Sequence, residues 1–172
     1  LKDHKATELG TAVVKKCMEH SNLNGSEVDT VILGQVLQTG CGQNPARQAA
    51  INSGIDKDKT ATTINQVCGS GLAAVTLGFN SLKLNDTNIV IAGGQESMTN
   101  SPHYLNYRME KNLSEEKLKD SMLIDGLIDA YDDYHMGVTA ENVAEKYQIT
   151  RNDQDNFALN SQKKAIKAIS EN

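Results

Sequence analysis

The sequence lacks the features that mark several large classes of protein. Its 172 residues contain no unbroken apolar stretch of about 18 side chains, the length that crosses a bilayer. The opening LKDHKATELG also lacks the apolar core of a secretion signal. We therefore expect a cytoplasmic protein with no membrane partner.

Basic side chains are too few and too scattered to form a polyanion-binding face. Lys and Arg number 17 against 22 Asp and Glu, and the formal net charge is -5. Nucleic acids and anionic membranes are bound by clustered basic surfaces. We therefore expect no nucleic-acid partner.

Cysteine is scarce, and its spacing excludes two kinds of cross-link. Cys17, Cys41 and Cys68 form an odd set with no C-x-x-C pair, which suits neither a disulfide framework nor a structural zinc site. We therefore expect free thiols. Cys17 is predicted to pack in the core, and Cys41 is predicted to lie in a loop without a functional role.

No other residues form a convincing metal site. His4, His20 and His103 have no histidine partner at i, i+4 and are predicted to be surface residues. The acidic stretch DAYDDY, residues 129–134, lacks the ligand spacing and central glycine of a calcium loop. We therefore expect no metal.

Hydrophobic periodicity predicts helices and strands in alternation. Apolar residues at helical spacing alternate with short β-branched runs, and Asn44 followed by Pro45 is a typical helix start. Such an order is typical of a parallel sheet with helices on its faces, so the predicted fold class is α/β. The predicted elements are helix 5–20, strand 29–38, helix 45–54, strand 60–65, helix 69–84 and strand 88–94.

The same periodicity predicts an apolar face on three helices. The final helix, 151–169, is preceded by a capping pair, Thr150 and Asp153. From Met98 the periodicity weakens, which indicates an insertion lying over the sheet. The predicted apolar positions are Leu9, Ala12, Val13 and Cys17 in the first helix, Leu72, Val75, Phe79 and Leu82 in the third, and Phe157, Ala158, Ala165 and Ile169 in the last.

Cys68 stands where a predicted strand meets a predicted helix, in the stretch TTINQVCGSGLAAV. A helix start stabilises a nearby anion by roughly 0.3–1 kcal/mol, and a thiolate is the reactive form of cysteine. Gly69 and Gly71 would let a bulky substrate approach. A lone cysteine is nevertheless often a packing residue, and both interpretations stay open on position alone.

Four longer motifs point to one family. NQVCGSGLAAV, IVIAGGQESMTNSPH, GQNPARQAA and YHMGVTAENVAEKYQITRNDQD together resemble the thiolase family, specifically its biosynthetic, acetoacetyl-CoA branch. The resemblance covers essentially the whole chain. It implies a thiolase-like N-terminal half, with an α/β domain over 1–97 and an inserted loop domain with its following helix over 98–172.

The resemblance also implies roles for particular residues. Cys68 matches the acyl-accepting nucleophile, whose backbone N–H contributes to an oxyanion hole. His135 and Met136 match positions that line the pantetheine and acetyl pocket, and a large Met suits a small acyl group. Coenzyme A thioesters are the substrates, so no cofactor is expected.

Other parts of the family pattern are missing from the 172 residues. There is no G-H-P motif and no C-x-G motif at the right distance for the remaining catalytic groups. The opening strand, expected to be central, is missing as well, which would leave two strand edges unpaired. We therefore expect an absent C-terminal domain and a chain that is inactive by itself.

The expected function is acetyl-CoA C-acetyltransferase activity, which condenses two acetyl-CoA to acetoacetyl-CoA and CoA or runs in reverse as thiolysis, in fatty acid metabolism. A degradative 3-ketoacyl-CoA thiolase is the enzymatic alternative, and a ketoacyl synthase is less consistent with GGQESM and TAENVA. A further alternative, outside the enzymes, is a non-catalytic half-protein that pairs with another chain. The resemblance also implies a homodimer or homotetramer.

Overall fold

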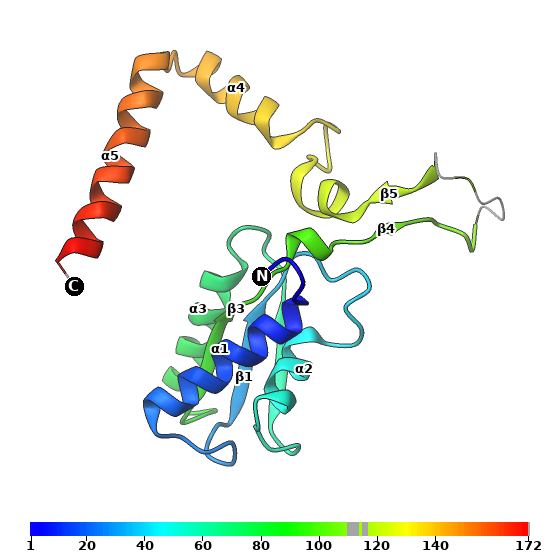
Figure 1. Cartoon of the computed structure of the whole chain (residues 1–172), viewed down its shortest axis with the longest axis vertical. Helices are drawn as coiled ribbons and strands as arrows, with labels where there is room; N and C mark the ends of the chain where they lie inside the picture. Colours follow the sequence, from blue (N-terminus) through cyan, green and yellow to red (C-terminus); the bar gives the residue numbers. More distant parts are fainter. Residues whose placement is uncertain (110–113, 115–116, 172) are drawn as a thin grey trace. The chain divides into compact units, whose positions relative to one another are not determined.

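The computed structural model describes residues 1–109, 114 and 117–171 (Figure 1). The chain forms two compact units, Leu1–Gly126 and Leu127–Asn172. The division into domains 1–97 and 98–172 stays a prediction.

The first unit is built on three parallel strands. These are β1 (Thr30–Gly34), β2 (Thr60–Ile64) and β3 (Val90–Gly94), in the spatial order β2-β1-β3. The predicted α/β class is confirmed. The expectation of a missing central strand is wrong, because β1 is itself central and pairs along its whole length with both neighbours.

Helices cover both faces of this sheet (Figure 1). Helices α1 (Ala6–Ser21) and α2 (Pro45–Asn52) cover one face, and α3 (Ser70–Lys83) covers the other. Successive strand residues point to opposite faces, so each strand contributes to both interfaces. The core beneath α1 and α2 includes Val14, Met18, Val28, Val31, Leu33, Ala46, Ala49, Ala50, Ile55 and Ile91.

Helix α1 buries a different face from the one predicted. Its buried positions are Ala6, Thr7, Gly10, Val14 and Met18. A Cβ at Gly10 would come within 1.6 Å of the Gln95 side-chain oxygen, so the helix packs closely through its small residues. Of the predicted stripe, Leu9 is partly buried and Ala12, Val13 and Cys17 are exposed. Core packing of Cys17 was therefore the wrong prediction.

Helix α2 begins as predicted. Asn44 is its N-cap and accepts a hydrogen bond from Arg47 N at 3.2 Å. The same side chain donates to Ala61 O at 2.9 Å and accepts from Thr63 Oγ1 at 2.8 Å. The cap thus also fixes the helix start against β2.

Helix α3 packs on the sheet through its small residues. Ser70, Ala74 and Gly78 are buried, and a Cβ at Gly78 would lie 3.0 Å from Val90. The predicted apolar residues lie on the side of α3 that faces away from the sheet. Their exposed fractions range from 41% for Leu82 to 74% for Leu72. The periodicity therefore identified the apolar face of α3 correctly, but this face is not the one that contacts the sheet.

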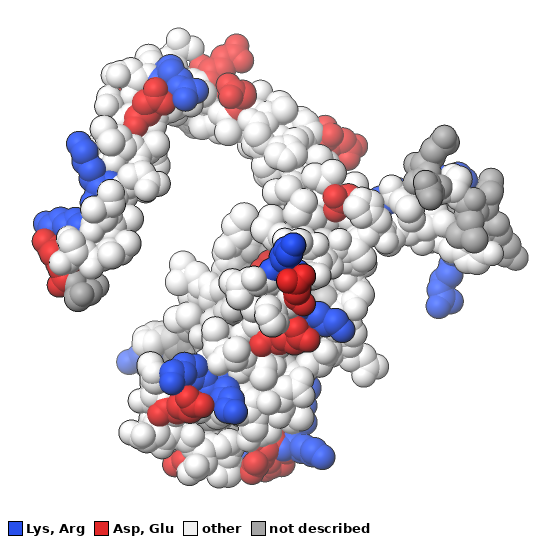
Figure 2. Space-filling model, in the orientation of Figure 1, with Lys and Arg blue, Asp and Glu red and all other residues white. Residues whose placement is uncertain are grey.

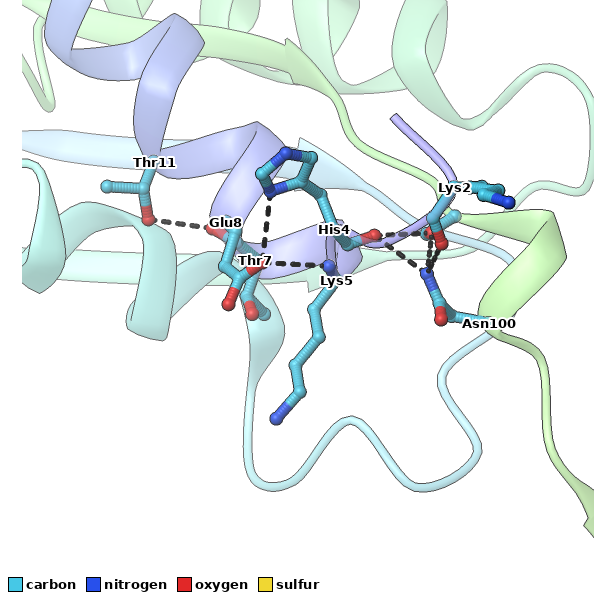
Figure 3. Close-up of polar contacts among 8 residues, drawn as sticks. Lys2, His4, Lys5, Thr7, Glu8, Thr11 and Asn100 are labelled. Atoms are coloured by element: carbon cyan, nitrogen blue, oxygen red, sulfur yellow. Dashed lines mark hydrogen bonds and ion pairs between the residues drawn. The ribbon is translucent and has the colours of Figure 1, made fainter.

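The chain beyond β3 returns to the start of α1. The short helix η1 (Met98–Asn100) is followed by an antiparallel pair, β4 (His103–Tyr104) and β5 (Lys119–Asp120), and by a π-helical turn, η3 (Leu123–Leu127). Asn100 donates from Nδ2 to Lys2 O at 2.9 Å and to His4 O at 2.8 Å (Figure 3). These bonds hold the first residues against the segment after β3.

The second unit contains α4 (Met136–Lys146) and α5 (Arg151–Ser170). The predicted capping pair is confirmed, since Thr150 Oγ1 accepts from Asp153 N at 3.2 Å and Asp153 Oδ2 accepts from Thr150 N at 3.0 Å. The Thr150 hydroxyl, which donates to Asp153 Oδ2 at 2.6 Å, and the Thr150 N–H lower the pKa of the Asp153 carboxyl below its ordinary value. The predicted apolar positions of α5 are exposed in the described residues, including Phe157 and Ile169.

Acidic and basic side chains are interspersed on the visible surface (Figure 2). Within the described residues, no helix is both long and apolar enough for a bilayer crossing. The expectations about nucleic acid, membrane and cellular location stay predictions.

Asp29 joins the amino ends of β1 and β3. Its Oδ2 accepts hydrogen bonds from Asn88 N at 2.7 Å and from Ile89 N at 3.1 Å. These two bonds hold the pKa of the Asp29 carboxyl below its ordinary value of 3.8. The ionised carboxylate therefore stabilises the folded state.

Asp29→Asn is expected to lower the free energy of unfolding at pH 7, measured by urea denaturation. A depressed folded-state pKa gives stability that is present above pH 3.8 and lost as pH falls through the folded value. The difference between parent and variant should therefore shrink at the acid end. Asp58→Asn, at an exposed position, is the control, and an unchanged midpoint for Asp29→Asn at pH 7 would contradict the assignment.

Candidate active site

Cys68 lies in the tight turn that connects β2 to α3. The helix begins at Ser70 with Gly69 as its N-cap, so Cys68 directly precedes the cap. Its side chain is exposed, and all three thiols are free as predicted. The predicted position at a helix start is confirmed, whereas its role as nucleophile stays a prediction.

The residue before Cys68 has an unusual backbone conformation. Val67 has a φ of 47°, a left-handed conformation that strains a β-branched side chain. Asn65 Oδ1 accepts a hydrogen bond from Val67 N at 2.9 Å. Strained backbone of this kind persists only where surrounding contacts hold it, and it is concentrated at functional sites.

Ser70 supplies the second set of contacts that hold this turn. Its hydroxyl accepts from Gln66 N at 2.8 Å and donates to Val67 O at 2.5 Å. The side chain is 4% exposed, so its bonds are shielded from water. Ser70 therefore fixes the backbone on the N-terminal side of Cys68.

Glycines allow the helix start to reach the ends of the strands. A Cβ at Gly34 would lie 2.5 Å from the Ser70 carbonyl carbon, and one at Gly94 would lie 3.5 Å from Gly71 Cα. Gly34 and Gly94 are the last residues of β1 and β3. Cys68 is thereby placed beside the carboxyl ends of two neighbouring strands.

A cavity of about 310 Å³ opens at this place. Ligands of open α/β sheets bind beyond the carboxyl ends of the strands, which is where it lies. The lining residues are Gly34, Gln35, Val36, Val67, Cys68, Ser70, Gly71, Gly94, Gln95 and Glu96.

Three polar residues of this cavity were missed by the sequence analysis. Glu96 accepts hydrogen bonds from Val36 N at 2.8 Å and Leu37 N at 3.1 Å, and the buried Gln95 donates from Nε2 to Gln35 Oε1 at 2.8 Å. Gln95 and Glu96 could have been found from their position just after the predicted strand 88–94. Gln35 falls inside the predicted strand 29–38, and the structure places it just after β1, which ends at Gly34.

Cys41 lies at a different cavity, of about 410 Å³, which is also lined by Thr7 and Ser101. Its Sγ accepts from Gln35 Nε2 at 3.3 Å and donates to Leu37 O at 3.5 Å. These contacts give the thiol a structural part in the loop after β1.

His135 and Met136 lie together in the second unit, at the start of α4. His135 is the N-cap, and its Nδ1 accepts a hydrogen bond from Gly137 N at 3.0 Å. Met136 lines a groove of about 440 Å³ together with Val143 and Ile149. Cys68 belongs to the first unit, and a pocket shared by the three residues stays a prediction.

Two of the other histidines, His4 and His103, make local contacts. His4 Nδ1 lies 3.5 Å from Glu8 (Figure 3), and His103 Nε2 lies 3.9 Å from Asp120. Within the part of the chain that the structure describes, no group of three or more His, Cys, Asp or Glu side chains is arranged to hold a metal ion.

Ser70→Ala is expected to lower the free energy of unfolding by about 1–3 kcal/mol, because it leaves Gln66 N and Val67 O without this partner. Thr76→Ala in the same helix removes an exposed bond to Leu72 O and should cost less than about 0.5 kcal/mol. Urea unfolding measures both. Equal midpoints for the two variants would show that Ser70 does not hold the turn.

Comparison with known proteins gives a consistent result. The family model described as the thiolase N-terminal domain matches residues 1–172. The chain is 52% identical over 165 residues to an acetyl-CoA acetyltransferase of Pseudomonas aeruginosa, covering 95% of this chain and 42% of the relative. It is 51% identical over 170 residues to a probable acetyl-CoA acetyltransferase of Escherichia coli, covering 98% and 43%.

A probable acetyl-CoA acyltransferase of Staphylococcus epidermidis is 51% identical over 168 residues, which is 97% of this chain and 43% of the relative. The chain thus spans somewhat less than half the length of the curated relatives it matches. The matched family model extends over all of its residues. This chain belongs to the thiolase family and corresponds to its N-terminal domain.

Proposed function

We propose that this chain carries the nucleophile of an acetyl-CoA C-acetyltransferase. The observation that carries the proposal is the position of Cys68, an exposed thiol beside a 310 Å³ cavity at the N-terminus of a 14-residue helix. A helix N-terminus stabilises a nearby negative charge, and the cavity gives room for a thioester carbonyl. Membership of the thiolase family supports this choice of chemistry.

The proposed reaction has two half-steps. Cys68 Sγ attacks the carbonyl carbon of acetyl-CoA, the bond from that carbon to the CoA sulfur breaks, and CoA leaves with a proton. The deprotonated α-carbon of a second acetyl-CoA then attacks the acetyl-cysteine carbonyl. Acetoacetyl-CoA is released and the Cys68 thiol is restored.

The two half-steps place different demands on the protein. The first needs a thiolate and donors for the carbonyl oxygen, for which we propose the Cys68 N–H. The second needs a base for the α-carbon, and the 172 residues contain neither the G-H-P nor the C-x-G motif of the family. We therefore propose that the chain by itself accepts an acetyl group but does not turn over.

His135 and Met136 belong to the proposal as substrate-binding residues. Met136 is 37% exposed at the start of α4, so part of its side chain is accessible to a ligand. A long, flexible thioether fills space beside a small acyl group. We further propose a cytoplasmic homodimer or homotetramer that needs no cofactor besides its coenzyme A substrates.

The exposed face of α3 favours a second proposal. Leu72, Val75 and Phe79 are 74%, 48% and 56% exposed, and a groove of about 770 Å³ runs beside Leu72 and Ile64. Contiguous apolar surface of this kind marks a contact with another polypeptide segment. In this proposal the chain is a non-catalytic half that completes a site only together with its partner.

The acetyl-transfer proposal predicts a covalent adduct. Incubation of the purified chain with acetyl-CoA should place one acetyl group on the peptide that contains Cys68, detected by mass spectrometry, with release of no more than an equivalent of CoA. Cys68→Ser should abolish the adduct, whereas Cys17→Ser, at another exposed thiol, should keep it. Continuous CoA release, or equal acetylation of Cys17 and Cys68, would contradict the proposal.

A further inference from the structure

Val67 is an unusual residue type for the backbone conformation that it adopts. Its φ of 47° lies in the left-handed region, where a β-branched side chain is a genuine outlier. Asn and Asp tolerate this region because their short polar side chains bond locally. Among the described residues, the other left-handed positions outside glycine are Asn22, Asn44, Asn85, Asp133 and Gln148. Val67 therefore carries a strain that most of these positions reduce through their residue type.

The Val67 side chain does not hold the turn in which it lies. The hydrogen bonds with Asn65 and Ser70 use the backbone N–H and carbonyl of Val67, so other residue types would form them as well. The side chain is 50% exposed, so its burial offsets little of the strain. A glycine would form the same turn without strain. The turn by itself thus gives no reason for a branched apolar side chain at this position.

Val67 instead contributes apolar surface to the Cys68 cavity, which has little of it. The other residues that line this cavity, besides Val36 and Cys68, are glycines or polar residues: Gly34, Gly71, Gly94, Gln35, Ser70, Gln95 and Glu96. Of the described residues in the lining, only Val36 and Val67 have hydrocarbon side chains. Val67 directly precedes Cys68 and is half exposed, whereas Val36 is partly buried. A small apolar group carried by the thiol therefore has Val67 as an accessible apolar neighbour.

We propose that Val67 is a specificity-determining residue of the Cys68 site, and that its side chain contacts the acyl group that Cys68 accepts. A β-branched side chain is stiff at χ1, and the contacts with Asn65 and Ser70 fix the backbone that carries it. Val67 thus forms a rigid apolar wall, which favours a short acyl group by contact and excludes a long one by lack of room. The inference rests on the proposed function for the identity of the substrate.

The first measurement is single-turnover acylation of Cys68 in the full chain, followed by mass spectrometry with acetyl-CoA and with hexanoyl-CoA. Val67→Ala should raise the ratio of the hexanoyl rate to the acetyl rate roughly 3- to 10-fold, because the short group loses a contact and the long group gains room. Val67→Thr keeps the branched shape and should stay within about twofold of the parent. Val13→Ala is the matched control, because Val13 is 57% exposed and does not line the cavity. An unchanged ratio in Val67→Ala would overturn the proposal.

The second measurement examines the same wall without acyl transfer. Methyl and pentyl methanethiosulfonate each form a mixed disulfide with a thiolate, which displaces methanesulfinate. The rate at Cys68, resolved by peptide mapping, is divided by the rate at the exposed Cys17. The pentyl-to-methyl ratio should rise in Val67→Ala and stay at the parent value in Val67→Thr and Val13→Ala. The same ratio in the parent and all variants would show that Val67 does not border the space beside the thiol.

Urea unfolding separates contact with the substrate from a structural role. Val67→Gly should keep or raise the midpoint of unfolding, because glycine adopts the left-handed conformation at no steric cost and little buried surface is lost. A lower midpoint would show that the valine side chain stabilises the fold, which contradicts the proposal.

The outcomes also distinguish this inference from the proposed function. If Cys68 takes no acyl group from either thioester while the thiosulfonate ratio rises in Val67→Ala, the proposed function fails and the wall formed by Val67 does not. If the parent is acylated and neither ratio changes in Val67→Ala, only the Val67 assignment fails.

Discussion

The close packing of α3 on the parallel sheet is the constraint on which the rest of the site depends. Gly34, Gly71 and Gly94 lie at the contact between the helix start and the ends of β1 and β3. A side chain at Gly34 would overlap the backbone of Ser70, so a larger residue there would push the helix away. Because the helix start is fixed, the turn before it is fixed as well, and with it Cys68.

Polar side chains then connect the strands at both ends. Asp29 bonds two amides at the amino end of β3, and Glu96 bonds two amides beyond the carboxyl end of β1. Each carboxylate satisfies backbone donors that lie outside the ladder of the sheet. The strand order is thus supported by contacts between residues about 60 positions apart, and a cavity bounded by three loops keeps a defined shape.

Local signals in the sequence were enough to predict where helices and strands begin and end. The cap at Asn44, the capping pair of Thr150 and Asp153, and the strand at Thr60–Ile64 follow the predictions closely. Predictions about which face is buried were less successful, because they ranked side chains by hydrophobicity. In α3 the sheet contacts the smallest residues, and in α1 Gly10 lies against Gln95 and Ala49, since only small residues allow such close approach. Larger apolar residues such as Val13 and Phe79 stay exposed.

The sequence by itself determined the α/β class, the positions of most elements, the family, and the place of Cys68 at a strand-to-helix turn, because each depends on periodicity, caps or motifs within a short segment. Only the tertiary structure decided that β1 is the central strand, that Ser70 and Asn65 hold a strained Val67, and that Glu96 faces the same cavity as Cys68. These facts depend on contacts between segments far apart in the chain. No local pattern specifies such contacts, because they follow from how whole strands and helices pack.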